Sequence, residues 1–259
     1  MEESERKLVS DATILGMLHP WMSNLANNIP AILNMECPHC GKKYDNCKDV
    51  RELIPSGGPA IIVGASPAIT KLKHLEMLSK SDFSGTVIAT DKMLIPCLRN
   101  DIVPDFVCSV DGAAEIATFY RHKFVYDNAS NIKAVMNSMV HPFVLKEFKG
   151  EKYIFHSTLD HDGPTSLTRA IHYMTRNTIT PGTGEVGGFC VHLATSLDFN
   201  PICFIGLSYG AYELEELGDY KAYINDVPED KRQIDKFFWK RTHPLWGECW
   251  TSMLWALPT

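Results

Sequence analysis

Short apolar runs alternate with longer amphipathic stretches along most of the chain, and this alternation predicts βαβ units in a mainly parallel sheet. The predicted strands are Ala60–Val63, Thr86–Ala89, Phe106–Val110, Lys133–Met136, Lys152–Phe155 and Pro201–Ile205. The spacing of apolar positions between them predicts helices over Ala68–Ser79, Met93–Leu98, Pro142–Phe148, Thr165–Met174 and Gly188–Leu197. We therefore expect an α/β fold with helices on both faces of the sheet.

Two flanking segments follow a different pattern. Residues 1–56 contain "ILGMLHPWMSNLANNIPAILNM", whose helix-spaced apolar positions are interrupted by prolines, and then a cluster of cysteines. We expect a small helical and Cys-rich N-terminal appendage, followed by an α/β domain over residues 57–212. Residues 213–259 are rich in tryptophan and are predicted to form a helical extension that covers a sheet edge or an oligomer contact.

Composition and charge narrow the class of protein. The chain has 259 residues, of which 45% are hydrophobic and 22% charged, so it has enough apolar side chains for one sizeable core. The formal net charge of −6 leaves no long basic surface for a nucleic-acid backbone. No apolar run reaches the ~20 residues that span a bilayer, and the acidic start "MEESERKLVSD" is unlike a signal peptide, so we expect a cytoplasmic protein. Several of the eight cysteines lie in apolar runs, as reduced core thiols do.

Small, polar and acidic residues follow the predicted strands, at the edge where parallel sheets bind ligands. They are Gly64, Ala65, Ser66 and Pro67 after the first strand, Asp91 and Lys92 after the second, Asp111 and Gly112 after the third, Asn137 and Ser138 after the fourth, and Ser208 and Tyr209 after the last. We expect these residues to line one binding site.

The corner "GASPAI" after the first strand has the features of a phosphate-binding turn. Gly64 permits a sharp turn and a close ligand, and the helix that begins at Pro67 would direct free N–H groups toward an anion. The corner is neither G-x-G-x-x-G nor a P-loop, which disfavours a dinucleotide dehydrogenase and a P-loop NTPase. A tight turn in which Ser66 only caps the helix is the alternative.

A second glycine cluster, in "TPGTGEVGGFCVHLA", precedes the last predicted helix. Its members are Gly182, Thr183, Gly184, Gly187 and Gly188. Exposed N–H groups at the start of this helix would suit a second contact with a phosphate, ribose or carboxylate. A flexible connection is the alternative.

Candidate titratable residues lie in the same region. Asp91 and Asp111 end neighbouring strands and could face one cleft, as pairs that bind a metal ion or a ribose do. Each could instead cap a helix. His156 and His161, in "FHSTLDHDGP", are candidates for a general base, although a lone histidine is more often structural.

The segment "ECPHCGKKYDNC" has the spacing of a zinc knuckle. Cys37 and Cys40 flank a turn, and Cys47 follows. A tetrahedral site needs a fourth ligand, for which the candidates are His39, Asp45, Cys249 and a residue of a second subunit. Reduced surface thiols are the alternative to a structural metal.

Three blocks of the sequence carry a resemblance to a known family. "PAIIVGASPAI", "VIATDKMLIPCLRNDIVPDFVCSVDG" and "GTGEVGGFCVHLATSLDFNPICFIGLSYG" resemble 6-hydroxymethylpterin diphosphokinase MptE-like domains, a family that includes motility accessory factors that glycosylate flagellin. The resemblance implies a Rossmann-like nucleotide-binding domain. The first and third blocks are also similar to the CMP-sugar motifs of bacterial sialyltransferases, although the G-x-G-P-S corner of those enzymes is replaced here by "GASPA". The turns at Asp91 and Asp111 look more like those of the motility accessory factors than those of the pterin kinases.

The resemblance implies a transferase with a nucleotide donor. One expectation is glycosyl transfer from a CMP-activated acidic sugar, with His156 or His161 as the base that deprotonates the acceptor. A second is ATP-dependent diphosphokinase activity on a pterin, with Asp91 and Asp111 holding Mg²⁺. A third, from another class, is a non-catalytic nucleotide- or sugar-binding module. The acceptor (protein, glycan or pterin) and a homo-oligomeric state are left open.

Overall fold

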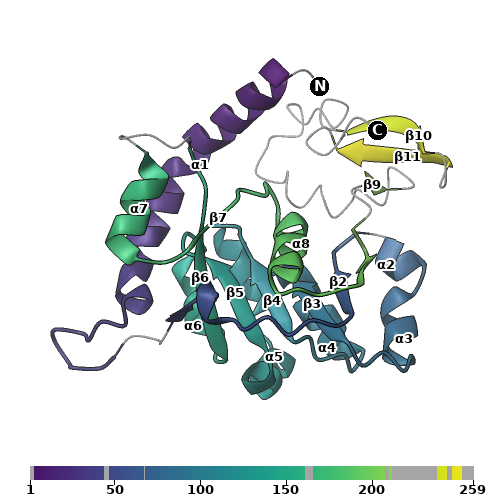
Figure 1. Cartoon of the computed structure of the whole chain (residues 1–259), viewed down its shortest axis with the longest axis horizontal. Helices are drawn as coiled ribbons and strands as arrows, with labels where there is room; N and C mark the ends of the chain where they lie inside the picture. The colour runs from purple at the N-terminus through teal and green to yellow at the C-terminus, as the bar shows by residue number, and fades with distance from the viewer. Residues whose placement is uncertain are drawn as a thin grey trace.

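Parallel strands form the centre of the computed structural model, which describes residues 3–43, 47–66, 68–160, 166–207, 210–211, 238–243 and 247–252 (Figure 1). The strands of the central sheet are β1 (Cys47–Asp49), β2 (Ala60–Val63), β3 (Thr86–Thr90), β4 (Phe106–Ser109), β5 (Lys133–Asn137), β6 (Glu151–Ser157), β7 (Ile179–Thr180) and β8 (Ile202–Ile205). Their order is β1-β6-β5-β4-β3-β2-β8, with β7 beside β6, and each described pair is parallel. The predicted strands and the α/β fold are confirmed.

Helices cover both faces of this sheet, because its strands are apolar on both sides. On one face lies α8 (Val186–Ser196), drawn in front of the strands in Figure 1, and the ring of Phe189 stacks on Phe155 of β6 with centroids 3.9 Å apart. The elements on the other face are α2 (Ala68–Lys71), α3 (His74–Ser79), α4 (Leu94–Arg99), α5 (Lys123–Asn128) and α6 (Pro142–Glu147), with the 3-10 turns η2 (Asp91–Met93), η3 (Ala114–Phe119) and η4 (Ala129–Asn131). The remaining ones are η1 (Val50–Glu52), after β1, and α7 (Leu167–Thr175), after β6.

The order of the strands changes direction next to β2. Strands β3, β4, β5 and β6 are added one after another on one side of β2, whereas β8 lies on its other side. Loops that leave the sheet in opposite directions at such a point open a crevice beyond the carboxyl ends of the strands, where α/β proteins bind ligands. The ends of β2, β3 and β8 are therefore where the fold places a site.

The N-terminal segment is more closely joined to the sheet than the sequence predicts. α1 (Glu3–Ile32) is one continuous helix, with Pro20 and Pro30 inside it. Leu25 of this helix is 1% exposed and belongs to the main core, and β1 pairs with β6 in the central sheet. Burial of one face of a long helix offsets the hydrogen bond that an internal proline removes. Part of the predicted appendage over residues 1–56 thus completes the α/β core.

Two other expectations differ from the structure. The single helix predicted over Ala68–Ser79 is two helices, because Lys73 between them adopts a left-handed φ of 54°. The helical extension predicted over residues 213–259 is wrong for its described part, which forms the strands β10 (Phe238–His243) and β11 (Gly247–Ser252), paired antiparallel and joined by β9 (Gly210–Ala211). Aromatic residues and threonine in these segments favour strands. Among the described helices, none is long and apolar enough to cross a lipid bilayer.

Candidate functional site

A pocket of about 370 Å³ lies beyond the carboxyl ends of β2 and β3. One wall comes from the turn after β2 and from α2 and α3, and the other comes from η2 and α4. The lining residues are Ala65, Ser66, Ile69, Thr70, Lys73, Leu75, Glu76, Lys92, Met93, Pro96, Arg99 and Asn100. This volume is in the range of small-molecule sites. The structure thus brings together two turns that the sequence predicted to form one site.

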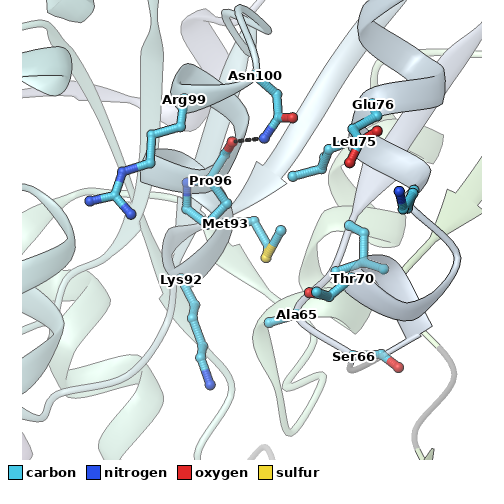
Figure 2. A pocket seen from close by; sticks show the side chains of 12 residues that line it. Ala65, Ser66, Thr70, Leu75, Glu76, Lys92, Met93, Pro96, Arg99 and Asn100 are labelled. Carbon is cyan, nitrogen blue, oxygen red and sulfur yellow. Dashed lines mark hydrogen bonds between the residues drawn. The ribbon is translucent and has the colours of Figure 1, made fainter.

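Basic side chains outnumber acidic ones in this pocket. Among the described residues that line it, Lys73, Lys92 and Arg99 accompany one carboxylate, that of Glu76. Figure 2 shows the amino group of Lys92 at the same end of the pocket as Ser66, whereas the guanidinium of Arg99 points away from Glu76. A surplus of cations beside a hydroxyl favours an anionic ligand such as a phosphate.

Backbone strain accompanies one of these cations. Lys73 has no glycine-like freedom, yet its φ of 54° lies in the left-handed region. For a residue with a Cβ this conformation costs roughly 1–2 kcal/mol. Lys73 lies between α2 and α3 and itself lines the pocket, so the strain is located at the pocket.

The corner after β2 is closed by the chain itself. Ser66 N–H donates to the Gly206 carbonyl at 2.8 Å, and the Ser66 hydroxyl accepts a 3.3 Å hydrogen bond from Ala68 N–H. A Cβ placed on Gly64 would lie 2.4 Å from Cδ2 of Leu207 and 2.5 Å from the Gly206 carbonyl oxygen. Gly64 is therefore required for close packing of the β2 and β8 turns. Pro67 lies outside the described residues.

The second glycine cluster also has an internal partner. The Glu185 carboxylate accepts hydrogen bonds from the N–H groups of Gly187, at 2.5 Å, and Gly188. These N–H groups, which we expected to be exposed for a ligand, are capped by the side chain that begins α8. A Cβ on Gly187 would lie 2.5 Å from Cδ2 of Leu207, so both glycine-rich turns meet at that leucine.

The other predicted members of these turns are placed as follows. Thr183 donates a 3.0 Å hydrogen bond from its hydroxyl to the Glu185 carbonyl. Gly182 lies beside the Thr158 carbonyl, and Gly184 uses a positive φ of 75° that favours glycine. Ser208 and Tyr209 lie outside the described residues. The second cluster is thus a structured turn, not a flexible connection.

Asp91 is a buried carboxylate. Its side chain accepts a 2.6 Å hydrogen bond from the Ser109 hydroxyl and a 2.8 Å bond from Lys92 N–H, and the residue is 4% exposed. The Tyr120 hydroxyl lies 3.0 Å from that of Ser109. Burial, with a smaller effect from the nearby charge of Asp111, raises the pKa of Asp91 to about 6, although the two hydrogen bonds and the charge of Lys92 act to lower it. Burial also raises the pKa of Tyr120 well above its usual range.

Asp111 is more open than Asp91. It is half-buried, and its carboxylate accepts a 2.9 Å hydrogen bond from Ala113 N–H within its own turn. Of the predicted catalytic residues, Asp91 and His156 are buried, so Asp111 is the accessible one within the part of the chain that the structure describes. His161 lies outside that part.

His156 is enclosed by hydrogen-bonding partners. Its Nδ1 contacts the Ser138 hydroxyl at 2.5 Å, its Nε2 contacts the Thr175 hydroxyl, and the side chain is 1% exposed. Burial lowers the pKa of His156 to about 4. A neutral histidine with both nitrogens engaged has no nitrogen free for an acceptor hydroxyl in this structure, which disfavours His156 as the base.

The turn after β5 is buried as well. Asn137 donates a 2.7 Å hydrogen bond to the Ser157 hydroxyl and accepts a 3.0 Å bond from Met139 N–H. Ser138, whose hydroxyl contacts His156, is 0% exposed. Asn137 and Ser138 therefore hold the sheet edge together and are not open to a ligand.

Two cysteines of the knuckle segment, Cys37 and Cys40, lie together with a side-chain hydrogen bond between them, whereas Cys47 belongs to the core. The turn that begins at Cys37 is closed by hydrogen bonds from Gly41 N–H to its carbonyl and from its own N–H to Lys42, and Cys40 is exposed. Cys47 is 5% exposed and belongs to the main core. Within the described residues, no group of three or more histidine, cysteine or acidic side chains could hold a metal ion. Asp45, a candidate ligand, lies outside the described residues, as does the side chain of Cys249.

Sequence analysis missed several residues of the pocket wall, namely Thr70, Lys73, Arg99 and Asn100. Thr70 and Lys73 are three residues apart just after the glycine corner, and Arg99 and Asn100 end the helix that follows Asp91. The first pair follows β2 and the second follows β3, which is the neighbouring strand. Polar residues in the short helical segments after neighbouring strands could therefore have indicated this pocket. The left-handed turn at Lys73 could not have been predicted, because no glycine marks it.

The chain is similar to one described protein family and to a solved structure with the same fold. A family model described as "6-hydroxymethylpterin diphosphokinase MptE-like" matches residues 23–213. Among solved structures, the fold is similar to the MAf glycosyltransferase from Magnetospirillum magneticum AMB-1, with a TM-score of 0.57 and 14% identity over 90% of this chain and 32% of the other. The chain spans about a third of that protein's length, and at this identity the likeness concerns the fold alone. No curated protein matches the sequence.

Proposed function

The chain belongs to the 6-hydroxymethylpterin diphosphokinase MptE-like family, and from this premise we propose that it is a nucleotide-dependent transferase that transfers a sugar from a CMP-activated acidic sugar. The observation that carries the proposal is the basic pocket at the ends of β2 and β3. Among its described residues the pocket has three basic side chains, Lys73, Lys92 and Arg99, and one carboxylate. It lies at the edge of the sheet where α/β proteins bind nucleotides. The fold shared with a glycosyltransferase supports the same class of reaction.

In this proposal the pocket binds the nucleotide phosphate. Lys92 and the Ser66 hydroxyl lie at one end of the pocket and would hold the phosphate oxygens (Figure 2). In the transfer, the bond between the anomeric carbon and the phosphate oxygen breaks, and its electron pair stays on the CMP that leaves. The Lys92 ammonium would stabilise the negative charge that develops on that phosphate.

The acceptor side needs a base. An acceptor hydroxyl oxygen bonds to the anomeric carbon and loses its proton as it does so. Asp111 is the candidate for receiving that proton, because it is the accessible one of the predicted catalytic residues that the structure describes, and it follows β4, the strand next to β3. Asp91 would keep the turn in place and would not itself contact the acceptor.

The alternative within the same family is an ATP- and Mg²⁺-dependent diphosphokinase, which the description of the family supports. It would use Asp91 and Asp111 as metal ligands. The hydrogen bonds that Asp91 already accepts from Ser109 and Lys92 N–H favour the metal-independent proposal, since both carboxylate oxygens have donors.

Calorimetric titration of the full chain with CMP and with ATP, each with and without Mg²⁺, tests the proposal. We expect CMP to bind without metal and Lys92→Ala to weaken its binding by about tenfold or more, since a hydrogen bond to a charged group contributes ~1.5–3 kcal/mol. Lys80→Ala is the matched control, because Lys80 is an exposed lysine at the end of α3 outside the pocket. ATP binding that strictly requires Mg²⁺, with no response to CMP, would favour the kinase instead.

Turnover separates an enzyme from a binding module. Incubation with CMP-activated acidic sugars and a panel of glycan and protein acceptors should release CMP only when an acceptor is present. Binding of CMP without any release, across the whole panel, would mean that the domain binds a nucleotide and does not transfer the sugar.

A further inference from the structure

Two asparagines of α1 reach the carboxyl edge of the sheet. Asn24 Nδ2 donates to the carbonyls of Gly112, at 2.8 Å, and Met139, at 3.1 Å. Asn28 Nδ2 donates to the carbonyls of Ser138, at 2.9 Å, and Val140, at 2.8 Å. The two asparagines are four residues apart, so they lie on the same face of the helix.

Both side chains are committed to these contacts. Asn24 is 7% exposed and Asn28 is 1% exposed, and each amide nitrogen gives its two hydrogens to two carbonyl groups. Buried carbonyls in turns need donors, and here one helix supplies them to two different turns. An apolar residue at either position would fill the same space and leave two carbonyls without these partners.

The turn that Asn24 holds carries Asp111, the accessible carboxylate among the predicted catalytic residues that the structure describes, which is not among the residues that line the pocket. Gly112 follows Asp111 directly, and a Cβ on Gly112 would lie 2.8 Å from Cδ1 of Trp21 and 3.0 Å from Nδ2 of Asn24. Gly112, predicted as a ligand contact, is therefore needed for the close approach of α1. The turn of Asp111 is held between Trp21, Asn24 and its own hydrogen bond to Ala113 N–H.

We propose that Asn24 is a positioning residue, through which α1 fixes the Asp111 turn at the carboxyl edge of the sheet, and that Asn28 fixes the neighbouring turn after β5. Asn24 joins the two turns because it binds the carbonyls of both Gly112 and Met139. The effect on transfer rests on the proposed function, whereas the effect on the turn does not. α1 would thus support the Asp111 turn from outside the pocket, because no α1 residue whose side chain the structure describes lines it.

Amide hydrogen exchange of the full chain tests the placement of the turns. In Asn24→Ala we expect exchange in the segment 110–113 to rise by about fivefold, the ratio that corresponds to one net hydrogen bond. Exchange near Met139 should rise with it, because Asn24 also binds the Met139 carbonyl. In Asn28→Ala the rise should be confined to the segment 137–140. Asn27→Ala is the matched control, because Asn27 is exposed and donates to the Ser23 carbonyl of its own helix. A general loss of stability would instead raise exchange in the central strands as well, and that result would contradict the inference.

Sugar transfer gives the second readout. If the wild-type protein releases CMP from the sugar donor when an acceptor is present, Asn24→Ala should lower the rate of that release several-fold, because Asp111 is the proposed base, while Asn27→Ala leaves the rate unchanged. Should Asn24→Ala fail to fold, Asn24→Ser keeps one donor and serves for the same comparison.

The outcomes separate the two proposals. Exchange in segment 110–113 that matches the Asn27→Ala control overturns the inference, and so does raised exchange with an unchanged rate of acceptor-dependent CMP release. A wild-type protein that binds neither CMP nor ATP contradicts the proposed function, and the exchange data alone then decide whether Asn24 positions the turn.

Discussion

The Ser109 hydroxyl donates a 2.6 Å hydrogen bond to the buried carboxylate of Asp91, and this bond joins the ends of β4 and β3. Tyr120, buried beneath it, lies 3.0 Å from the same hydroxyl. A carboxylate held in this way is a structural support for the accessible Asp111 and for Lys92, which lines the pocket. Protonation of the Asp91 carboxylate is therefore coupled to the stability of this edge of the sheet.

Asp91→Asn should change how stability depends on pH. The folded protein keeps the Asp91 proton up to a pKa of about 6, compared with 3.8 for an ordinary aspartate, so its contribution to stability is fully present below 3.8 and is lost as pH rises through about 6. The loss is on the order of 3 kcal/mol in the free energy of unfolding. Asparagine has no charge to bury, so the variant should be as stable as the wild type or more so at pH 7. Urea unfolding from pH 4 to 8 measures this; a stability difference that does not vary with pH would contradict it.

His156→Gln should reveal the opposite slope. The pKa of His156 is lowered from 6.5 to about 4, so its contribution is fully present above 6.5 and is lost as pH falls through about 4. That loss is also on the order of 3 kcal/mol, and between the two folded-state pKa values it opposes the Asp91 contribution. We expect the variant to be less stable at pH 7, because its buried partners Ser138 and Thr175 lose their fit, yet less sensitive to acid. If the free energy of unfolding of the variant falls as steeply below pH 6.5 as that of the wild type, His156 is not a neutral buried group.

Gly64→Ala and Gly187→Ala should differ in whether they can be rescued. Both Cβ atoms would meet Leu207, but the one on Gly64 would also lie 2.5 Å from the backbone carbonyl of Gly206. Overpacking of this kind costs ~1–3 kcal/mol. In a Leu207→Ala background, the cost of Gly187→Ala should fall, because its remaining close neighbour is the flexible Glu185 side chain, while that of Gly64→Ala should persist. Chemical unfolding of the two double-mutant cycles measures both couplings, and equal rescue would count against the backbone contact.

Lys73→Gly should separate strain from binding. Glycine adopts the φ of 54° without penalty, so we expect the free energy of unfolding to rise by about 0.5–1 kcal/mol. The same change removes a cation from the pocket and should weaken CMP binding. Lys73→Ala is the matched control, because it removes the cation and keeps the strain. Thermal unfolding and calorimetry of the pair test this, and equal stability of the two variants would show that the turn is not strained.

Cys37 and Cys40 should hold zinc, whereas Cys47 should not. The first two flank the turn closed by Gly41, and Cys47 is 5% exposed in the core. Elemental analysis of protein purified without added metal should show zinc that is lost in Cys37→Ser and Cys40→Ser and retained in Cys47→Ser. About one zinc ion per chain would mean that one chain supplies all the ligands. About one zinc ion per two chains would mean that a second copy supplies the remaining ligands. If the purified wild-type protein holds no zinc and is as stable as the Cys37→Ser and Cys40→Ser variants, the zinc hypothesis is wrong.

Apolar patterning was sufficient for the sheet because a strand that is buried on both faces must be a continuous apolar run. Ala60–Val63 is predicted and observed with the same ends. The family resemblance, which the match over residues 23–213 confirms, rests on the turns after these strands. Patterning was insufficient for the helix break at Lys73, since the left-handed turn there has neither glycine nor proline. It also failed for α1, whose prolines imply an end that burial of its apolar face overrides.

The α/β class, the family and the strand ends at which polar residues gather could be predicted before any coordinates, because each follows from local patterning. The contacts of those polar residues depend on the folded arrangement of the chain. Gly64 and Gly187 pack against Leu207, and the Glu185 carboxylate takes the N–H groups that were expected to bind an anion. Lys73 and Lys92 line one pocket because the segments that follow the neighbouring strands β2 and β3 form its two walls. Spacing along a chain specifies which residues reach an edge, whereas the partner of each one depends on side chains that arrive from distant segments.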